Sequence, residues 1–250
     1  MNVLKFLIFG VSLFFLSSCR PNDKPVMPNP DAVVLFSFTH SIQGQPMVRS
    51  TSVHTNKAGN NYTIDLLKYY ISNITFVDDK GIETNYKNYN LIDAFDVQST
   101  SFILDRKTLN GNYRKIKFYV GVDQERNHTG AQEGALSASN GMLWTWTFGY
   151  VFYKLEGRFT TASITTETAY RNHLGTDSAL VKIELPLLLD VKGVDRKINI
   201  NLDIDKVLGD AASVIDFTVD NNRQSNIGDE VWMKKMKSNM ANAFTLSSVE

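Results

Sequence analysis

The sequence predicts an all-β fold: a mainly antiparallel β-sandwich of the immunoglobulin-like kind, with a short C-terminal helix. Several segments alternate between apolar and polar residues, which is typical of strands with one buried face. Turn signals rich in Gly, Asn and Asp separate these segments, as at residues 78–81 and 109–112. Helix-like segments do not alternate regularly with strand-like ones, which argues against a parallel α/β sheet.

The expected strands follow one another along the chain. Residues 32–38 alternate and lead into His40, so the first strand should end close to an imidazole. Residues 62–77 are rich in Ile, Tyr and Leu and predict one or two strands. Further strands are expected at residues 89–95, 113–122, 180–189 and 196–204. Pro186 predicts a strand edge, a bend or a break, whereas the Thr-rich residues 158–177 are ambiguous.

The end of the chain changes from a strand-like to a helix-like period. Asp229 is a suitable N-cap, because its carboxylate can accept a hydrogen bond from a backbone N–H of the first helical turn. Apolar residues then share one broad stripe at helical spacing: Trp232, Met233, Met236, Met240 and Phe244. We therefore expect one helix here, with its methionines filling the core.

An aromatic stretch at residues 143–152 is the most unusual feature of the sequence. Its period of two predicts one long strand, and the rings on one face would be Trp144, Trp146, Phe148, Tyr150 and Phe152. Two indoles on one strand face are costly to leave in water, and each N–H needs a partner when buried. The stretch therefore belongs to the core, to a functional site, or to both.

The N-terminus has the pattern of a bacterial lipoprotein precursor. Residues 1–18 read as a signal peptide, with an apolar run too short to span a bilayer, and they end before Cys19 in a lipobox. Lipidation at Cys19 would use the only cysteine and hold the protein in the cell envelope, at the periplasmic or surface face of the outer membrane. Residues 19–31 are Pro-rich and predict an extended tether. Residues 32–250 then form one domain.

Charge and motif content exclude several classes of function. The 26 basic and 26 acidic side chains balance, and no basic stripe stands out, so nucleic acid is not an expected partner. The sequence has no zinc-protease, hydrolase or phosphate-loop motif. No nucleophile, base and orienting group can be assembled, so we expect a binding protein rather than an enzyme.

Short motifs spread along the chain point to a family. They are Phe36-Ser37-Phe38-Thr39-His40, Lys68-Tyr69-Tyr70-Ile71-Ser72-Asn73, Tyr89-Asn90-Leu91-Ile92-Asp93, Gly121-Val122-Asp123, Asn140-Gly141-Met142 before Trp144-Thr145-Trp146, and Asn172-His173-Leu174-Gly175. In this order they resemble the MbnP-like, methanobactin-associated family of secreted copper-binding proteins. Two positions depart from the family pattern: Ser137-Ala138 stands where Asp-Pro is expected, and Thr176 stands where a second glycine is expected.

The resemblance implies a function and its residues. Copper, as Cu(I) or Cu(II), would be bound by His40 and His173. A di-haem peroxidase of the MbnH or MauG type would be the partner, and it would oxidise Trp144 or Trp146 to kynurenine beside the metal. Imidazole suits both copper oxidation states. A blue-copper site is excluded, because no thiolate remains after lipidation.

Alternatives stay open at this stage. His128 is either a third ligand or a solvated loop residue, and His54 has the same two interpretations. Met142 and the helix methionines could offer thioether ligands to Cu(I), although core packing is the expected role of Met233, Met236 and Met240. A different class of function is a glycan- or peptide-binding module, in which Trp144, Trp146 and Tyr150 form an exposed platform.

Overall fold

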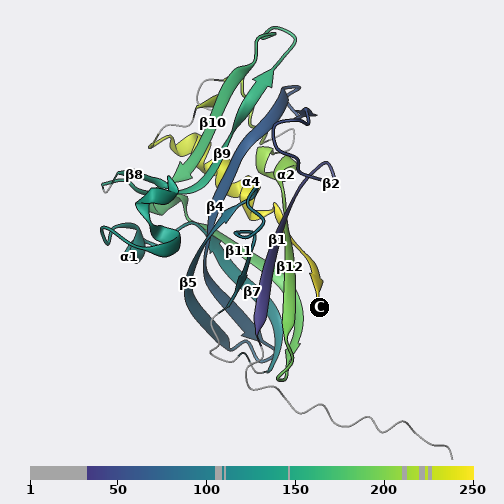
Figure 1. The fold of residues 1–250 in the computed structure, drawn as a ribbon, viewed down its shortest axis with the longest axis vertical. Coiled ribbons are helices and arrows are strands. Elements are labelled where there is room, and N and C mark those ends of the chain that lie inside the picture. Colours follow the sequence, from purple (N-terminus) through teal and green to yellow (C-terminus); the bar gives the residue numbers. More distant parts are fainter. Residues whose placement is uncertain are drawn as a thin grey trace, which may run out of the picture.

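The computed structural model describes residues 33–104, 109, 111–145, 147–209, 213–219, 223–224 and 227–250. Two β-sheets pack face to face, and a few short helices lie around them (Figure 1). The prediction of an all-β sandwich is confirmed. The signal peptide, Cys19, the Pro-rich tether and Trp146 lie outside the described residues.

The smaller sheet is centred on β1 (Val34–Ile42). β1 lies parallel to β12 (Arg196–Asp203), which is antiparallel to β13 (Phe244–Val249). β2 (Gln45–Pro46) and β6 (Ser101–Ile103) are antiparallel to β1. The strands expected at residues 32–38 and 196–204 therefore pair with each other, although more than a hundred residues separate them.

The larger sheet has the order β10-β9-β4-β7-β11. Its bounds are β4 (Asn61–Asp78), β7 (Gly111–Val120), β9 (Gly149–Thr160), β10 (Thr168–Gly175) and β11 (Val181–Val191). β3 (His54–Thr55) and β5 (Glu83–Asp93) pair with the other edge of β4, and β8 (Leu143–Thr145) pairs with β9. Residues 61–78 thus form one long strand, and the ambiguous region 158–177 contains the last three residues of β9 and all of β10.

The core lies between the two sheets. Phe36 and Phe38 project from β1, and Tyr69 and Tyr153 project toward them from β4 and β9; all four are buried. Burial alternates along β11, as expected for a strand with one buried face. The pairing of β11 with β7 becomes irregular between Pro186 and Leu189, which agrees with the bend predicted at the proline.

The C-terminal helix α4 (Glu230–Ala241) begins as predicted. Asp229 caps it by accepting a hydrogen bond of 3.0 Å from the backbone N–H of Trp232. Trp232, Met236 and Met240 are buried, and α4 packs against β11 and α2 (Ile204–Leu208). The prediction that Phe244 belongs to the helix is wrong: the helix is capped at Asn242, and Phe244 begins β13, where its ring packs against Phe118.

The prediction of one long aromatic strand is also wrong. The chain reverses between Thr145 and Gly149, so that β8 and β9 form a hairpin in which Leu143 pairs with Tyr150. Gly149 has a positive φ of 79°, and a Cβ atom there would lie 2.2 Å from Asn127 Oδ1. A turn that needs a glycine, rather than the alternation of rings, decides the local structure.

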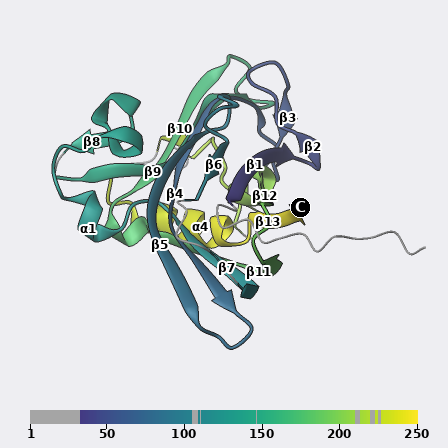
Figure 2. The same ribbon diagram turned by 60° about the horizontal axis from the view of Figure 1, so that its bottom comes forward.

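Residues 123–140 form a long loop, which contains only short helical turns. These are α1 (Gln124–Asn127), η1 (Gly134–Leu136) and η2 (Ala138–Asn140), and η3 (Asp177–Ala179) follows β10. β8 and α1 lie on one side of the molecule, whereas β2 and the C-terminus lie on the other (Figure 2). Within the described residues, no helix combines the length and hydropathy needed to cross a membrane.

Candidate functional site

His173 lies on the outer face of the larger sheet, near the end of β10. Its neighbour in the chain, Leu174, points into the core and is buried, so His173 points the opposite way. His173 Nε2 lies 2.7 Å from a carboxylate oxygen of Glu156 on β9. Burial lowers the pKa of His173, and the hydrogen bond to Glu156 opposes this effect in part. The imidazole is therefore mainly neutral at pH 7.

Trp144 and His173 line the same small pocket between β8, β10 and the start of α4. The indole is half-buried and packs closely over Gly175, where a Cβ atom would lie 2.6 Å from Trp144 Cζ3. Asp229 and Met233, from the start of α4, complete this side of the pocket. The predicted proximity of the aromatic stretch to one of the histidines thus holds for Trp144 and His173.

His40 has a different environment. It lies on β1 and faces the core, where its Nε2 is 3.0 Å from the hydroxyl of Tyr69 and the two rings meet edge to face. Burial lowers the pKa of His40 to about 4, and the negative charge of Asp93 opposes the shift in part. His40 is therefore neutral at physiological pH and is held by a buried phenol.

The larger sheet separates the two histidines. Tyr69, Tyr153 and Leu174 lie side by side on its core face, and His40 contacts this row through Tyr69. The preceding residue of β4, the following residue of β9 and the preceding residue of β10 form the neighbouring row on the outer face: Lys68, Lys154 and His173. The structure does not bring His40 and His173 together, and the described residues contain no cluster of three His, Cys, Asp or Glu side chains placed to hold a metal. Their assignment as copper ligands stays a prediction.

The two other histidines have partners of different kinds. His128 Nε2 lies 3.1 Å from both carboxylate oxygens of Asp177, and the imidazole is 40% exposed. His54 packs against the ring of Tyr62, and its Nε2 is buried without a hydrogen-bond partner among the described residues. Neither lines the pocket shared by His173 and Trp144.

The methionines divide into two groups. Met142, Met236 and Met240 are almost completely buried in the core, as expected for core packing. Met233 is only partly buried and lines the pocket of His173, so it is the methionine placed to offer a thioether to a ligand there. Its sulfur accepts a hydrogen bond of 3.4 Å from the hydroxyl of Ser178.

The exposed aromatic platform expected for a glycan- or peptide-binding module is not formed by Trp144 and Tyr150. Tyr150 is buried, and its hydroxyl donates a hydrogen bond of 2.6 Å to the carbonyl of Leu136. Trp144 packs over Gly175 instead of standing free. The hairpin between β8 and β9 is the reason, because it folds Trp144 back beside β9 instead of extending the strand.

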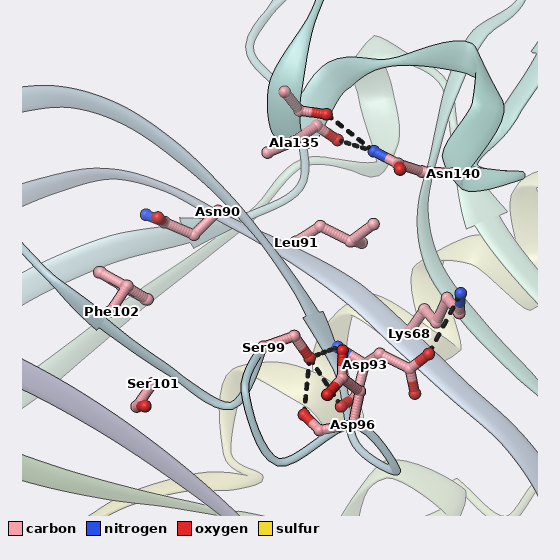
Figure 3. A pocket seen from close by; sticks show the side chains of 11 residues that line it. Lys68, Asn90, Leu91, Asp93, Asp96, Ser99, Ser101, Phe102, Ala135 and Asn140 are labelled. Atoms are coloured by element: carbon pink, nitrogen blue, oxygen red, sulfur yellow. Dashed lines mark hydrogen bonds and ion pairs between the residues drawn. The ribbon is translucent and has the colours of Figure 1, made fainter.

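A second pocket was not predicted from the sequence. It has a volume of about 410 Å³ and lies between β4, β5, the loop after β5 and the turns η1 and η2 (Figure 3). Lys68 and Asp93 form an ion pair of 3.1 Å in its wall, and Asn140 lies opposite, where its amide donates hydrogen bonds to the carbonyls of Gly134 and Ala135. The family-like motifs contain Lys68, Asp93 and Asn140, but no periodicity indicates that they converge.

A family comparison agrees with the resemblance seen in the sequence. The model of the MbnP family matches residues 31–229 of the chain. No curated protein sequence matches. Among solved structures, MbnP from Methylosinus trichosporium is similar, with 14% sequence identity and a TM-score of 0.49 over 71% of this chain and 78% of that one.

Proposed function

This chain belongs to the MbnP family, and we propose that it is a copper-binding protein of the bacterial cell envelope that acts in copper acquisition or handling. It would be a binding protein and not an enzyme. A lipid on Cys19 would hold it at the outer membrane, and a di-haem peroxidase of the MbnH or MauG type would oxidise Trp144 or Trp146 to kynurenine.

One observation carries the proposal: a neutral imidazole and an indole share the pocket of His173. A carboxylate can only accept a hydrogen bond, so in the neutral ring the proton is on Nε2, toward Glu156, and the lone pair is on Nδ1. Histidines that bind metals commonly donate their other ring N–H to a carboxylate, which fixes the ring and raises its basicity. The arrangement of His173 and Glu156 fits this pattern.

The other groups of the pocket suit copper as well. The thioether of Met233 is a soft ligand of the kind that Cu(I) prefers, and the carboxylate of Asp229 is a harder ligand that suits Cu(II). His40 does not line this pocket, and its Nε2 is already hydrogen-bonded to the hydroxyl of Tyr69. We therefore propose His173, with Glu156 as its orienting partner, as the centre of the copper site.

Trp144 is the more suitable of the two candidate tryptophans for modification, because its ring lies in the pocket with His173. When bound, copper would supply a redox-active Lewis acid at this position. Oxidation of the indole to kynurenine would place a new carbonyl and an aniline nitrogen in the same pocket. The role of the chain itself is to hold the ring there, packed over Gly175.

Metal analysis of the full chain, purified from membranes of its native host, tests the proposal. We expect copper in the parent protein, loss of copper in His173→Ala, and retention in His40→Ala, which serves as the matched control. Glu156→Ala should lower copper affinity about 10–100-fold. Copper binding that is unchanged in His173→Ala would refute the site, and equal losses in both histidine variants would instead favour a shared two-histidine site.

Two further measurements test the rest of the proposal. Mass spectrometry of peptides should show a mass gain on the peptide with Trp144 only when the haem partner is present. A Cys19→Ala variant should lose its lipid and leave the membrane fraction. If this variant remains in the membrane fraction, the proposed anchor is wrong.

A further inference from the structure

The pocket beside β5 has the composition of a site for a small polar molecule. Its volume of about 410 Å³ falls within the range of small-molecule sites, roughly 300–1,000 Å³. It lies along β5, between this strand, β6 and the loop of residues 134–140, and it shares no lining residue with the pocket of His173. It can therefore be considered independently of copper.

The charges of the pocket decide which ligands it disfavours. Among the described residues that line it, Lys68 is the only cation, and it is paired at 3.1 Å with Asp93. Asp96 adds a second carboxylate. Among these described residues, an anionic ligand such as a phosphate or a carboxylate would meet two negative charges and no unpaired cation. A neutral ligand avoids this repulsion.

Several polar groups of the lining have unused hydrogen-bonding capacity. Asp93 uses both of its oxygens, one for Lys68 and one for the backbone N–H of Phe95, whereas Asp96 uses one oxygen for the N–H of Gln98. Among the described residues, the side chains of Asn90 and Ser101 make no hydrogen bond. An amide, a hydroxyl and a carboxylate offer both donors and acceptors, which neighbouring hydroxyl groups of one ligand can satisfy together.

The apolar part of the lining is small and firmly held. Leu91 lies in the middle of the pocket between its polar ends (Figure 3), and Phe102 lies at its side. The ring of Phe102 stacks on Phe36 and Phe38, with centroid distances of 5.3 and 6.0 Å, so it cannot turn away easily. A ligand with a polar edge and a C–H face would match this surface better than a wholly apolar ligand.

The wall formed by the loop after β5 is also fixed in advance. The hydroxyl of Ser99 makes two hydrogen bonds with the backbone of Asp93. It accepts one from the N–H at 2.8 Å and donates one to the carbonyl at 2.9 Å. Asn140 ties η1 to η2 on the opposite wall. Walls that are already ordered reduce the entropy cost of binding.

From these features we propose that this pocket binds a neutral mono- or disaccharide. Asp96, Asn90 and Ser101 would bind hydroxyl groups, and Leu91 and Phe102 would contact a C–H face of the sugar ring. The inference does not depend on copper binding, and its failure would leave the proposed function intact.

Saturation-transfer difference NMR and calorimetry on the full chain test this proposal. The protein is purified in a detergent without a sugar headgroup and is titrated with glucose, N-acetylglucosamine, maltose, lactose and cellobiose. At least one of these sugars should bind with a Kd between micromolar and millimolar, whereas inorganic phosphate should not compete. Maltoheptaose is compared with maltose: tighter binding of the longer sugar would identify a glycan chain as the source of the saccharide, and weaker binding a free sugar.

Variants connect the binding to the pocket. Leu91→Trp should fill the pocket and abolish binding, and Asp96→Ala, at an exposed position, should weaken it by about tenfold or more. Leu188→Trp, which changes an exposed leucine on β11, is the matched control and should bind as the parent does. The absence of binding for all the sugars, or equal binding by the parent and Asp96→Ala, would overturn the proposal even if Leu91→Trp failed to fold.

Discussion

Gly175→Ala tests the close packing that places Trp144 in the pocket of His173. A Cβ atom at this position would lie 2.6 Å from Trp144 Cζ3 and 2.6 Å from the carbonyl oxygen of Tyr150. Both distances are shorter than van der Waals contact allows, so the indole or the backbone of β9 must move. Gly175 does not have a positive φ, so the substitution brings no strain of the left-handed kind. The expected cost therefore comes from the two contacts.

The size of the effect follows from the cost of overpacking. Added methyl groups in tightly packed positions lower the free energy of unfolding by about 1–3 kcal/mol. For a domain of this size, 1 kcal/mol corresponds to about 2–4 °C in Tm, so we expect Tm to fall by ~2–12 °C. The tryptophan fluorescence of the folded protein should also change, because the indole of Trp144 must shift.

Urea unfolding of four proteins measures the contact: the parent, Gly175→Ala, Trp144→Ala and the double variant. If the ring of Trp144 is the main obstacle, Gly175→Ala should cost less in the Trp144→Ala background, with a coupling energy of at least ~0.5 kcal/mol. Additive effects would show that the indole does not pack on Gly175. A Gly175→Ala variant as stable as the parent would refute the described packing of this pocket.

The remaining predictions concern stability at three other positions. His40 has a folded-state pKa of about 4 against an ordinary value of 6.5, so the folded protein binds fewer protons than the unfolded chain. The free energy of unfolding of the protein should therefore fall by up to ~3 kcal/mol as the pH drops from 6.5 to 4. Urea unfolding across that pH range should show a smaller loss for His40→Gln. An unchanged pH dependence in this variant would contradict the buried neutral imidazole. Asp229→Ala removes the N-cap hydrogen bond to Trp232 and should lower the free energy of unfolding by ~1 kcal/mol in the same assay. Asp229→Asn keeps an acceptor at this position and should lower it less. Equal losses in the two variants would show that the cap does not contribute to stability. Asn127→Ala leaves the buried N–H of Tyr150 without its acceptor, which lies at 2.7 Å, and should lower the free energy of unfolding by about 1–3 kcal/mol. Thermal unfolding measures this loss, with the exposed substitution Thr129→Ala as the control. A change in Tm smaller than that of the control would refute the role of this hydrogen bond.

The sequence by itself determined the regularly alternating strands and the family. Alternation along residues 196–204 and 113–122 decided which side chains are buried, because a strand with one face in the core must place its apolar residues two apart. The start of α4 was readable for a similar reason, since the cap at Asp229 and the helix it begins are neighbours in the chain. Such features depend on local chemistry, which a single sequence contains.

The aromatic stretch shows where local reasoning fails. Alternating rings at residues 143–152 fit a single strand, but they fit two short strands joined by a turn equally well. The choice depends on Gly149 and on the side chain of Asn127, which accepts a hydrogen bond from the backbone of Tyr150. Asn127 comes from a loop more than twenty residues away, so no window of sequence around the rings contains the deciding contact.

Only the tertiary structure decided which candidate residues meet. His40 and His173 come from different sheets. The face that His173 occupies depends on the register of β10, β9 and β4, where a shift of one residue would exchange the core and outer faces. The same register places His173 in one pocket with Trp144 and Met233, and the pairing of β4 with β5 brings Lys68 beside Asp93 in the other. Spacing along the chain could name these side chains, but long-range strand pairing determines which of them lie together, because it fixes both the neighbour and the face of each residue.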